Sequence, residues 1–204
     1  MSARSVVVVS AGLGNPSSTR LLADRLAGAS DRALRLHDEP VRIQTVELRD
    51  LAHEITDNLL TGFPGERLAE AVRSVREADA VIAVTPVFSA SYSGLFKSFL
   101  DVLEEGSLAG KPVLLGATAG TARHSLVLEF AMRPLFAYLR AVVVPTAVFA
   151  ASEDFGSNVS GSLDQRVDLA GRELADLVLG RRDSTVVDPF ENPTPFAQLL
   201  SGGR

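Results

Sequence analysis

Hydroxyl side chains gather around a glycine-containing segment near the N-terminus. An apolar run at 5–10 leads into Gly12 and Gly14, and a helical pattern begins at Arg20. The residues that could face one ligand there are Ser10, Ser17, Ser18 and Thr19, with Leu13 beside them. Free amides at a helix start, together with hydroxyls, suit a phosphate dianion. The lysine of a nucleotide-triphosphate loop is missing, so the pattern favours a terminal monophosphate.

Two other interpretations of this segment stay open. Gly12-x-Gly14 after a strand also begins a dinucleotide-binding fingerprint, but Ser17 takes the third glycine position. Glu47 lies 33 residues beyond Gly14, whereas the ribose-binding acid of that fingerprint lies about 20 residues on. Ser17 to Thr19 could also simply cap a helix, the commoner role of hydroxyls there. Four hydroxyls around one strand end favour a ligand.

The residues around Gly12 and Gly14 would form one wall of a ligand site. A second candidate wall follows the apolar run that begins at Ala80. Pro86 has no N–H for a sheet ladder, so pairing is expected to stop there and free the next amides. Phe88 offers flat apolar surface, and the small residues around Ser89 allow close approach to the backbone. The predicted ligand-facing residues are Pro86, Val87, Phe88 and Ser89. The alternative is an ordinary strand-to-helix connection with surface aromatics.

The third wall is predicted after the apolar run at 113–117. Thr118, Ala119 and Gly120 could place amides and a hydroxyl along the edge of a flavin ring, with His124 near by. Amides aimed at the ring stabilise the negative charge of reduction without a titrating residue.

The elements that must position these walls alternate along the chain. Apolar runs predict five strands, at 5–10, 41–47, from 80 to the loop at 86, at 113–117 and at 142–149. Helical periodicity is seen at 20–27, 66–77, 95–103, 126–139 and 163–179, with Pro134 expected to kink the fourth helix or start a new one. Leu21, Leu22 and Leu26 are expected to share the buried face of the first helix. This alternation predicts a doubly wound parallel α/β sheet of flavodoxin-like order 2-1-3-4-5, with helices on both faces. The three candidate loops then follow strands 1, 3 and 4 at one edge.

Composition excludes several classes of function. No cysteine is present, so thiolate catalysis and cysteine-held metals are ruled out, and the three histidines lack ligand spacing. A net charge of −5 without a basic stripe argues against nucleic acid. No apolar run reaches the length of a membrane span, so we expect a cytoplasmic protein. We expect one domain over residues 1–180 and a C-terminal tail at 181–204.

Segments 85–103, 108–115 and 117–121, with His124 and Arg133-Pro134, resemble the NAD(P)H-dependent FMN reductases of the flavodoxin-like superfamily. The resemblance is to those that partner alkanesulfonate-type flavin monooxygenases. It implies FMN with its phosphate at Ser17, Ser18 and Thr19 and its ring beside the other two loops. It also implies a homodimer or homotetramer, with nicotinamide stacking on the exposed flavin and hydride transferred by placement, without a catalytic side chain.

The sequence departs from the sulfonate-system pattern at two points. Phe130 stands where those reductases carry a tyrosine in an interface helix, and the chain beyond Phe149 does not match closely. We therefore expect a reductase that serves another flavin-dependent monooxygenase, of the luciferase-like class. The alternatives are a quinone or azo reductase that retains FMN, and a non-catalytic flavodoxin-like electron carrier. The basic and apolar character around Lys97 argues against the carrier.

Overall fold

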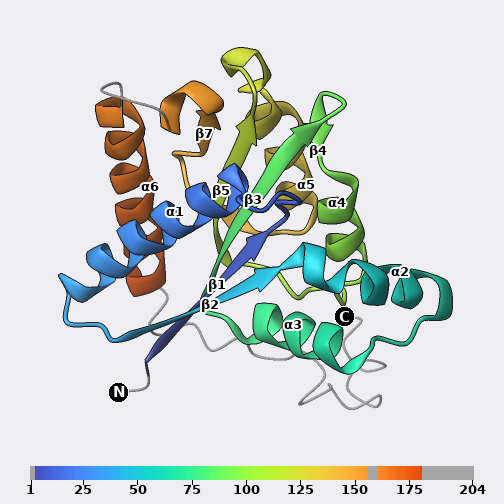
Figure 1. Ribbon diagram of the computed structural model, residues 1–204. Helices are drawn as coiled ribbons and strands as arrows, with labels where there is room; N and C mark the ends of the chain where they lie inside the picture. The colour runs from blue at the N-terminus through green and yellow to red at the C-terminus, as the bar shows by residue number, and fades with distance from the viewer. Residues whose placement is uncertain (1–2, 156–159, 181–204) are drawn as a thin grey trace, which may run out of the picture.

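The computed structural model describes residues 3–155 and 160–180 (Figure 1). The expected C-terminal tail at 181–204 lies outside these residues. The strands are β1 (Arg4–Ser10), β2 (Val41–Glu47), β3 (Ala80–Phe88), β4 (Ser91–Tyr92), β5 (Pro112–Ala119), β6 (Val142–Val143) and β7 (Val148–Ala151). The helices are α1 (Ser18–Arg35), α2 (Ala52–Thr61), α3 (Glu66–Glu77), α4 (Gly94–Asp101), α5 (Arg133–Tyr138) and α6 (Ser160–Gly180). Short helical turns lie at η1 (Leu48–Leu51), η2 (Ala122–His124), η3 (Leu128–Met132) and η4 (Ser152–Phe155).

The sheet has the order β2-β1-β3-β5-β6, and β7 also pairs with β5. All of these pairings are parallel, so the predicted flavodoxin-like order 2-1-3-4-5 is confirmed. Seven strands replace the expected five, because β4 adds a short antiparallel pairing and the fifth position is divided between β6 and β7. The carboxyl ends of β1, β3 and β5 therefore lie side by side, as the site requires.

The division of the fifth strand has two causes, a proline and the side chains that bond the backbone beside it. Pro145 cannot donate to a ladder, and side chains satisfy the backbone on both sides of it. The Arg133 guanidinium donates to the carbonyls of Val144 and Pro145, at 3.1 and 3.0 Å. Glu173 accepts from the Thr146 amide at 2.7 Å and from its hydroxyl at 2.9 Å. The expected continuous strand at 142–149 is thus wrong, since two distant side chains hold its middle out of the sheet.

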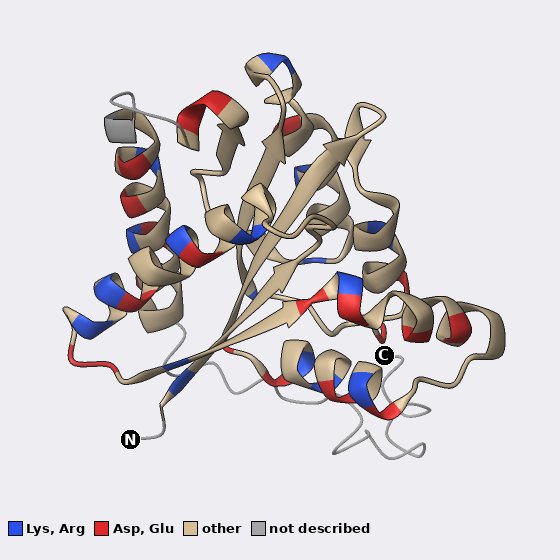
Figure 2. Ribbon diagram, viewed as in Figure 1, with Lys and Arg blue, Asp and Glu red and all other residues tan. Residues whose placement is uncertain are grey.

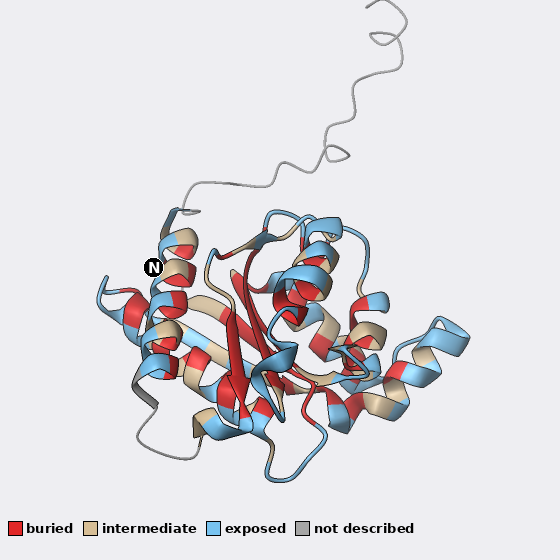
Figure 3. Cartoon of the chain, turned by 90° about the horizontal axis from the view of Figure 1, so that it is seen from above, coloured by how far each residue is buried: buried red, intermediate tan, exposed pale blue. Residues whose placement is uncertain are grey.

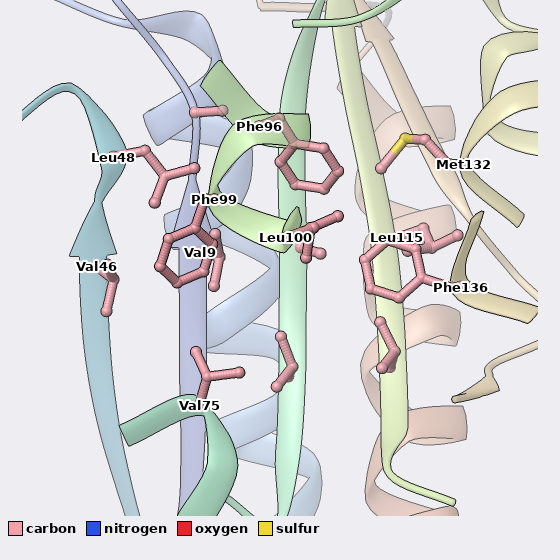
Figure 4. Packing of buried hydrophobic residues seen from close by; sticks show 14 of the residues in the cluster. Val9, Val46, Leu48, Val75, Phe96, Phe99, Leu100, Leu115, Met132 and Phe136 are labelled. Carbon is pink, nitrogen blue, oxygen red and sulfur yellow. The ribbon is translucent and has the colours of Figure 1, made fainter. Parts of the chain in front are cut away.

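Helices cover both faces of the sheet, as expected (Figures 1 and 3). Alternate residues of β1 show the division: Val6 and Val8 face α1 and α6, whereas Val7 and Val9 face the helices of the other layer. In that second layer Phe96, Phe99 and Phe136 pack over the sheet from α4 and α5 (Figure 4). Both faces of the central strands are buried under helices, which explains their unbroken apolar runs.

Helix α1 is longer than its predicted core at 20–27, and one expectation about its buried face is wrong. Leu22 and Leu26 are fully buried, but Leu21 is 43% exposed. The inward stripe of α1 continues through Ala29 and Ala33 instead, following the helical period.

Two other segments differ in detail from their expected patterns. The stretch at 48–64, between the predicted strand at 41–47 and the predicted helix at 66–77, contains η1 and the whole of α2. The predicted helix at 126–139 is divided into the π-helical turn η3 and then α5, with Pro134 in the first turn of α5. The expectation that Pro134 marks a new helical start is confirmed, because that turn needs no amide from it.

Lys111 is a buried cation at the amino-terminal end of β5. It is 5% exposed, and its ammonium group donates to the carbonyls of Val75 and Arg76 at 2.6 and 2.7 Å. These carbonyls end α3 and have no helical partner of their own. Lys111→Met is expected to lower the free energy of unfolding by about 2–3 kcal/mol, because it leaves buried acceptors unsatisfied. Urea unfolding measures this.

Lys97→Met is the matched control for that measurement. Lys97 pairs with Asp101 at 2.6 Å on the surface of α4, and exposed pairs at this spacing contribute about 0.3–0.5 kcal/mol. Equal losses in the two variants would contradict the capping role of Lys111.

Candidate functional site

Three loops at the carboxyl edge of the sheet enclose a cavity of about 300 Å³. The residues that line it are Leu13, Gly14, Pro16, Ser17, Ser18, Thr19, Pro86, Val87, Phe88, Thr118, Ala119, Gly120 and Ser152. All of the predicted ligand-facing residues except Ser10, Ser89 and His124 are in this set. A larger hollow of about 450 Å³ lies between α1 and α6, lined by the carboxyl-terminal half of α1 rather than by these loops.

The amino terminus of α1 forms one end of the cavity. Ser17 caps the helix, and its Oγ accepts from the Arg20 amide at 3.2 Å. The first amides of a helix have no intrahelical acceptor, so those of Ser18 and Thr19 are free to bind an anion. No acidic residue stands in this first turn to repel one.

Gly12 and Ser10 lie behind the lining residues at this end of the cavity. A Cβ on Gly12 would overlap Ser17 Oγ and come within 3.1 Å of Thr19 Cβ, so the loop can lie against the helix start only with glycine there. Ser10 is fully buried, and its Oγ has no hydrogen-bond partner among the described residues. A buried hydroxyl without a partner is costly, and a ligand oxygen beside the strand end would satisfy it.

A buried pair of hydroxyls joins the first loop to the third. Thr19 Oγ1 and Thr118 Oγ1 lie 2.8 Å apart, and both residues are almost fully buried. The start of α1 and the end of β5 are thereby held in one arrangement, although they are 99 residues apart in the chain.

The second wall is a hairpin rather than an open loop. Pairing of β3 with β5 does end at Pro86, but the strand continues to Phe88 and β4 pairs back onto it. The amides after Pro86 were expected to be free. This expectation is wrong, because Val87 and Phe88 pair with β4. Ser89 and Ala90 form the turn with φ of 48° and 66°, a left-handed conformation that usually calls for glycine or asparagine. Phe88 remains 46% exposed at the cavity.

Thr85 holds the base of this hairpin from inside the sheet. Its hydroxyl accepts from the Ser93 amide and donates to the Pro86 carbonyl, both at 3.0 Å. Thr85→Val is expected to lower the free energy of unfolding by about 2 kcal/mol, since the buried Ser93 amide loses its acceptor. It should also weaken ligand binding in the cavity several-fold, because Pro86 and Phe88 are held less firmly. Urea unfolding and a binding titration measure the two effects.

Thr56→Val provides the control, because Thr56 donates to a carbonyl on the exposed surface of α2. We expect a change within about 0.5 kcal/mol there. If Thr85→Val were equally mild, Thr85 would not hold the hairpin.

The charges around the cavity are arranged so that none projects into it. No ionisable side chain lines it. Arg20, at the start of α1, binds Glu47 and Asp24, and these hydrogen bonds raise the pKa of its guanidinium above the usual value. A ligand in the cavity therefore meets only neutral donors and apolar surface. Within the described residues, no group of side chains is suited to hold a metal ion.

Some residues behave differently from their sequence-based assignments. His124 is exposed on η2, and Ser89 lies in the hairpin turn, so neither lines the cavity. Gly14, Pro16 and Ser152 line it without having been predicted. Ser152 directly follows β7, and placing the end of the fifth strand at Ala151 rather than at Phe149 would have identified it.

Several known proteins are similar to this chain. The family described as NADPH-dependent FMN reductase matches residues 4–156. A Pseudomonas aeruginosa protein named FMN reductase (NADPH) is 34% identical over 180 residues, which cover 87% of this chain and 94% of that protein. The NADH-dependent FMN reductase SfnE of Pseudomonas putida is 33% identical over 174 residues, covering 84% and 91%. The solved structure of an oxidoreductase from Corynebacterium diphtheriae has a TM-score of 0.85 and 44% identity, covering 87% and 98%.

The matched region contains the whole cavity and the three loops that form it. The family match and the fold thus agree over most of the chain's length. The chain belongs to the NADPH-dependent FMN reductase family.

Proposed function

We propose that FMN binds between the three loops, accepts hydride there from NAD(P)H, and leaves in reduced form for a separate flavin-dependent monooxygenase. The chain is an oxidoreductase of the NAD(P)H:FMN reductase type. The proposal adds the residues that hold FMN, its release, and the partner.

The observation that carries the proposal is the division of one cavity into a donor-rich end and an apolar end. The FMN phosphate would lie at the start of α1, on the amides of Ser18 and Thr19, with the unpaired Ser10 hydroxyl near by. The ring would lie between the hairpin side, at Pro86 to Phe88, and the β5 side, at Thr118 to Gly120. The residues present fit both parts of FMN.

A bound flavin supplies a hydride acceptor for the nicotinamide. The protein's contribution is placement: the hairpin and the end of β5 fix the plane of the ring, and backbone amides after β5 favour the charge that develops on reduction. No lining side chain can act as an acid or base, so catalysis rests on orientation.

The uncharged lining supports release of the flavin. The phosphate would be held by amides and hydroxyls alone, without the charge-assisted arginine or lysine contacts that give the strongest phosphate binding. FMN is then a substrate that exchanges between turnovers rather than a fixed prosthetic group.

We also propose a homodimer or homotetramer. Large apolar side chains are exposed on η3, on α5 and just before them: Leu126 by 63%, Phe130 by 77% and Tyr138 by 84%. Exposed apolar side chains of this size, close together in the chain, support burial against another chain. Light scattering at several concentrations measures the assembly.

The experiment that tests the proposed function is steady-state oxidation of NADPH and NADH with FMN, FAD and menadione varied in turn. We expect turnover to require added FMN and to produce free reduced flavin that a purified flavin-dependent monooxygenase can use. If menadione alone supports turnover and flavin stays with the protein through gel filtration, the chain is a flavin-retaining quinone reductase instead.

The helices of the described residues include none long and apolar enough to cross a membrane.

A further inference from the structure

The cavity offers no cationic partner for the phosphates of the nicotinamide dinucleotide. Its donors at the start of α1 match one phosphate, that of FMN, and its lining holds no cation. A nicotinamide dinucleotide carries two linked phosphates, and NADPH carries a third on its ribose. These charges must be bound outside the cavity, and arginine is the side chain whose geometry suits phosphate best.

Most arginines near this edge of the sheet are already engaged by other groups. Their partners are carboxylates or backbone carbonyls: Arg20 with Asp24 and Glu47, Arg25 with Asp164, Arg49 with Gly14 and Asp50, and Arg166 with Ser162 and Phe149. Each of these guanidinium groups therefore already has at least one protein partner, with which a phosphate would compete.

Arg123 is different. It is exposed on η2, and its guanidinium has no hydrogen bond or ion pair with another described residue. It follows Gly120, which lines the cavity, by three positions. Turn η2 contacts β7, and the residue after β7 is Ser152, another lining residue. Turn η2, which carries this arginine, therefore lies beside the loops that form the cavity.

The rim is asymmetric in charge. On η4, Glu153 is exposed and Asp154 accepts from the Ala151 amide at 2.7 Å. Figure 2 shows basic colour on η2 and acidic colour on η4 above the same edge of the sheet. Phosphates that leave the cavity are repelled on the η4 side and attracted on the η2 side.

We propose that Arg123 binds a phosphate of the nicotinamide dinucleotide and so sets how tightly NADPH and NADH are held. The inference rests on the NAD(P)H:FMN reductase activity and adds the element that anchors the hydride donor. The dinucleotide then crosses the rim over η2, with its nicotinamide in the cavity.

The test compares Arg123→Ala and Arg123→Lys with the wild-type enzyme at saturating FMN. Arg123→Ala is expected to raise the KM for the dinucleotide about tenfold, the order of one charge-assisted contact, with kcat unchanged. Arg123→Lys should recover most of that loss, because it keeps the charge. Calorimetric titration of the FMN-loaded protein with NADP⁺ and NAD⁺ should show the same weakening without turnover. A loss confined to NADPH and NADP⁺ identifies the ribose phosphate, and equal losses identify the linked phosphates.

Arg73→Ala is the matched control, since Arg73 is another exposed arginine, on α3, and does not line the cavity. It should leave both KM values unchanged. The proposal is overturned if Arg123→Ala changes neither dinucleotide, if Arg73→Ala has the same effect, or if the dissociation constant of FMN alone rises with the KM. A wild-type protein that oxidises neither NADH nor NADPH would contradict the reductase activity itself, a result distinct from these.

Discussion

Ser18→Asp is expected to weaken FMN binding strongly while leaving the folded protein at least as stable as the wild type. Ser18 is exposed in the first turn of α1, where no acidic residue stands. A carboxylate there interacts favourably with the helix dipole, by about 0.3–1 kcal/mol. The same carboxylate takes the free amides that the phosphate needs, and it repels the dianion. We expect FMN affinity to fall about 100-fold, or about 2.7 kcal/mol.

The ligand pair FMN and riboflavin makes this result specific. Riboflavin lacks the phosphate, so its affinity should change little in Ser18→Asp, whereas the affinity for FMN should fall about 100-fold. Ser18→Asn keeps the shape without the charge and should retain most FMN binding. Fluorescence titration gives all of these constants, and thermal unfolding gives the stability. Equal losses for the two flavins would place the phosphate elsewhere.

Gly12→Ala is expected to have the second largest effect. The added methyl would overlap Ser17 Oγ, and that hydroxyl can move only by giving up its cap on the Arg20 amide. Loss of a cap costs about 1 kcal/mol, and the loop must also move away from Thr19. We expect the KM for FMN to rise about 30-fold, or about 2 kcal/mol, with a smaller loss of stability.

Gly28→Ala separates this effect from the general consequences of replacing a glycine. Gly28 lies inside α1, and a Cβ there meets only Arg32 Nη1, at 3.5 Å. That variant should gain about 0.5–1 kcal/mol of stability and keep the wild-type KM. If Gly12→Ala also kept the wild-type KM, close approach of this loop to the helix would not matter for the site.

The sheet order and several elements could be predicted because their patterns are local. The bounds of β2 and α3 agree with the alternation at 41–47 and the periodicity at 66–77. Three small-residue loops after strands 1, 3 and 4 were enough to indicate where a cavity forms, since parallel strands end at one edge.

The rest depended on contacts between distant parts of the chain. The division of the fifth strand needs Arg133 and Glu173, neither of which is near 144–147 in sequence order. The hairpin was missed because its turn, Ser89-Ala90, carries neither glycine nor asparagine, the usual signal for left-handed residues. The direction in which His124 faces is set by η2 as a whole, and residue type alone could not give it.

The hydroxyl pair between Thr19 and Thr118 has a consequence for how a flavin gets in and out. While that bond holds, the start of α1 and the end of β5 move as one piece. Pairing of β3 with β5 ends at Pro86 and Thr118, so the hairpin turn at Ser89 and Ala90 lies beyond that ladder. We therefore expect the hairpin turn, rather than the junction of α1 with β5, to move when a flavin enters or leaves the cavity.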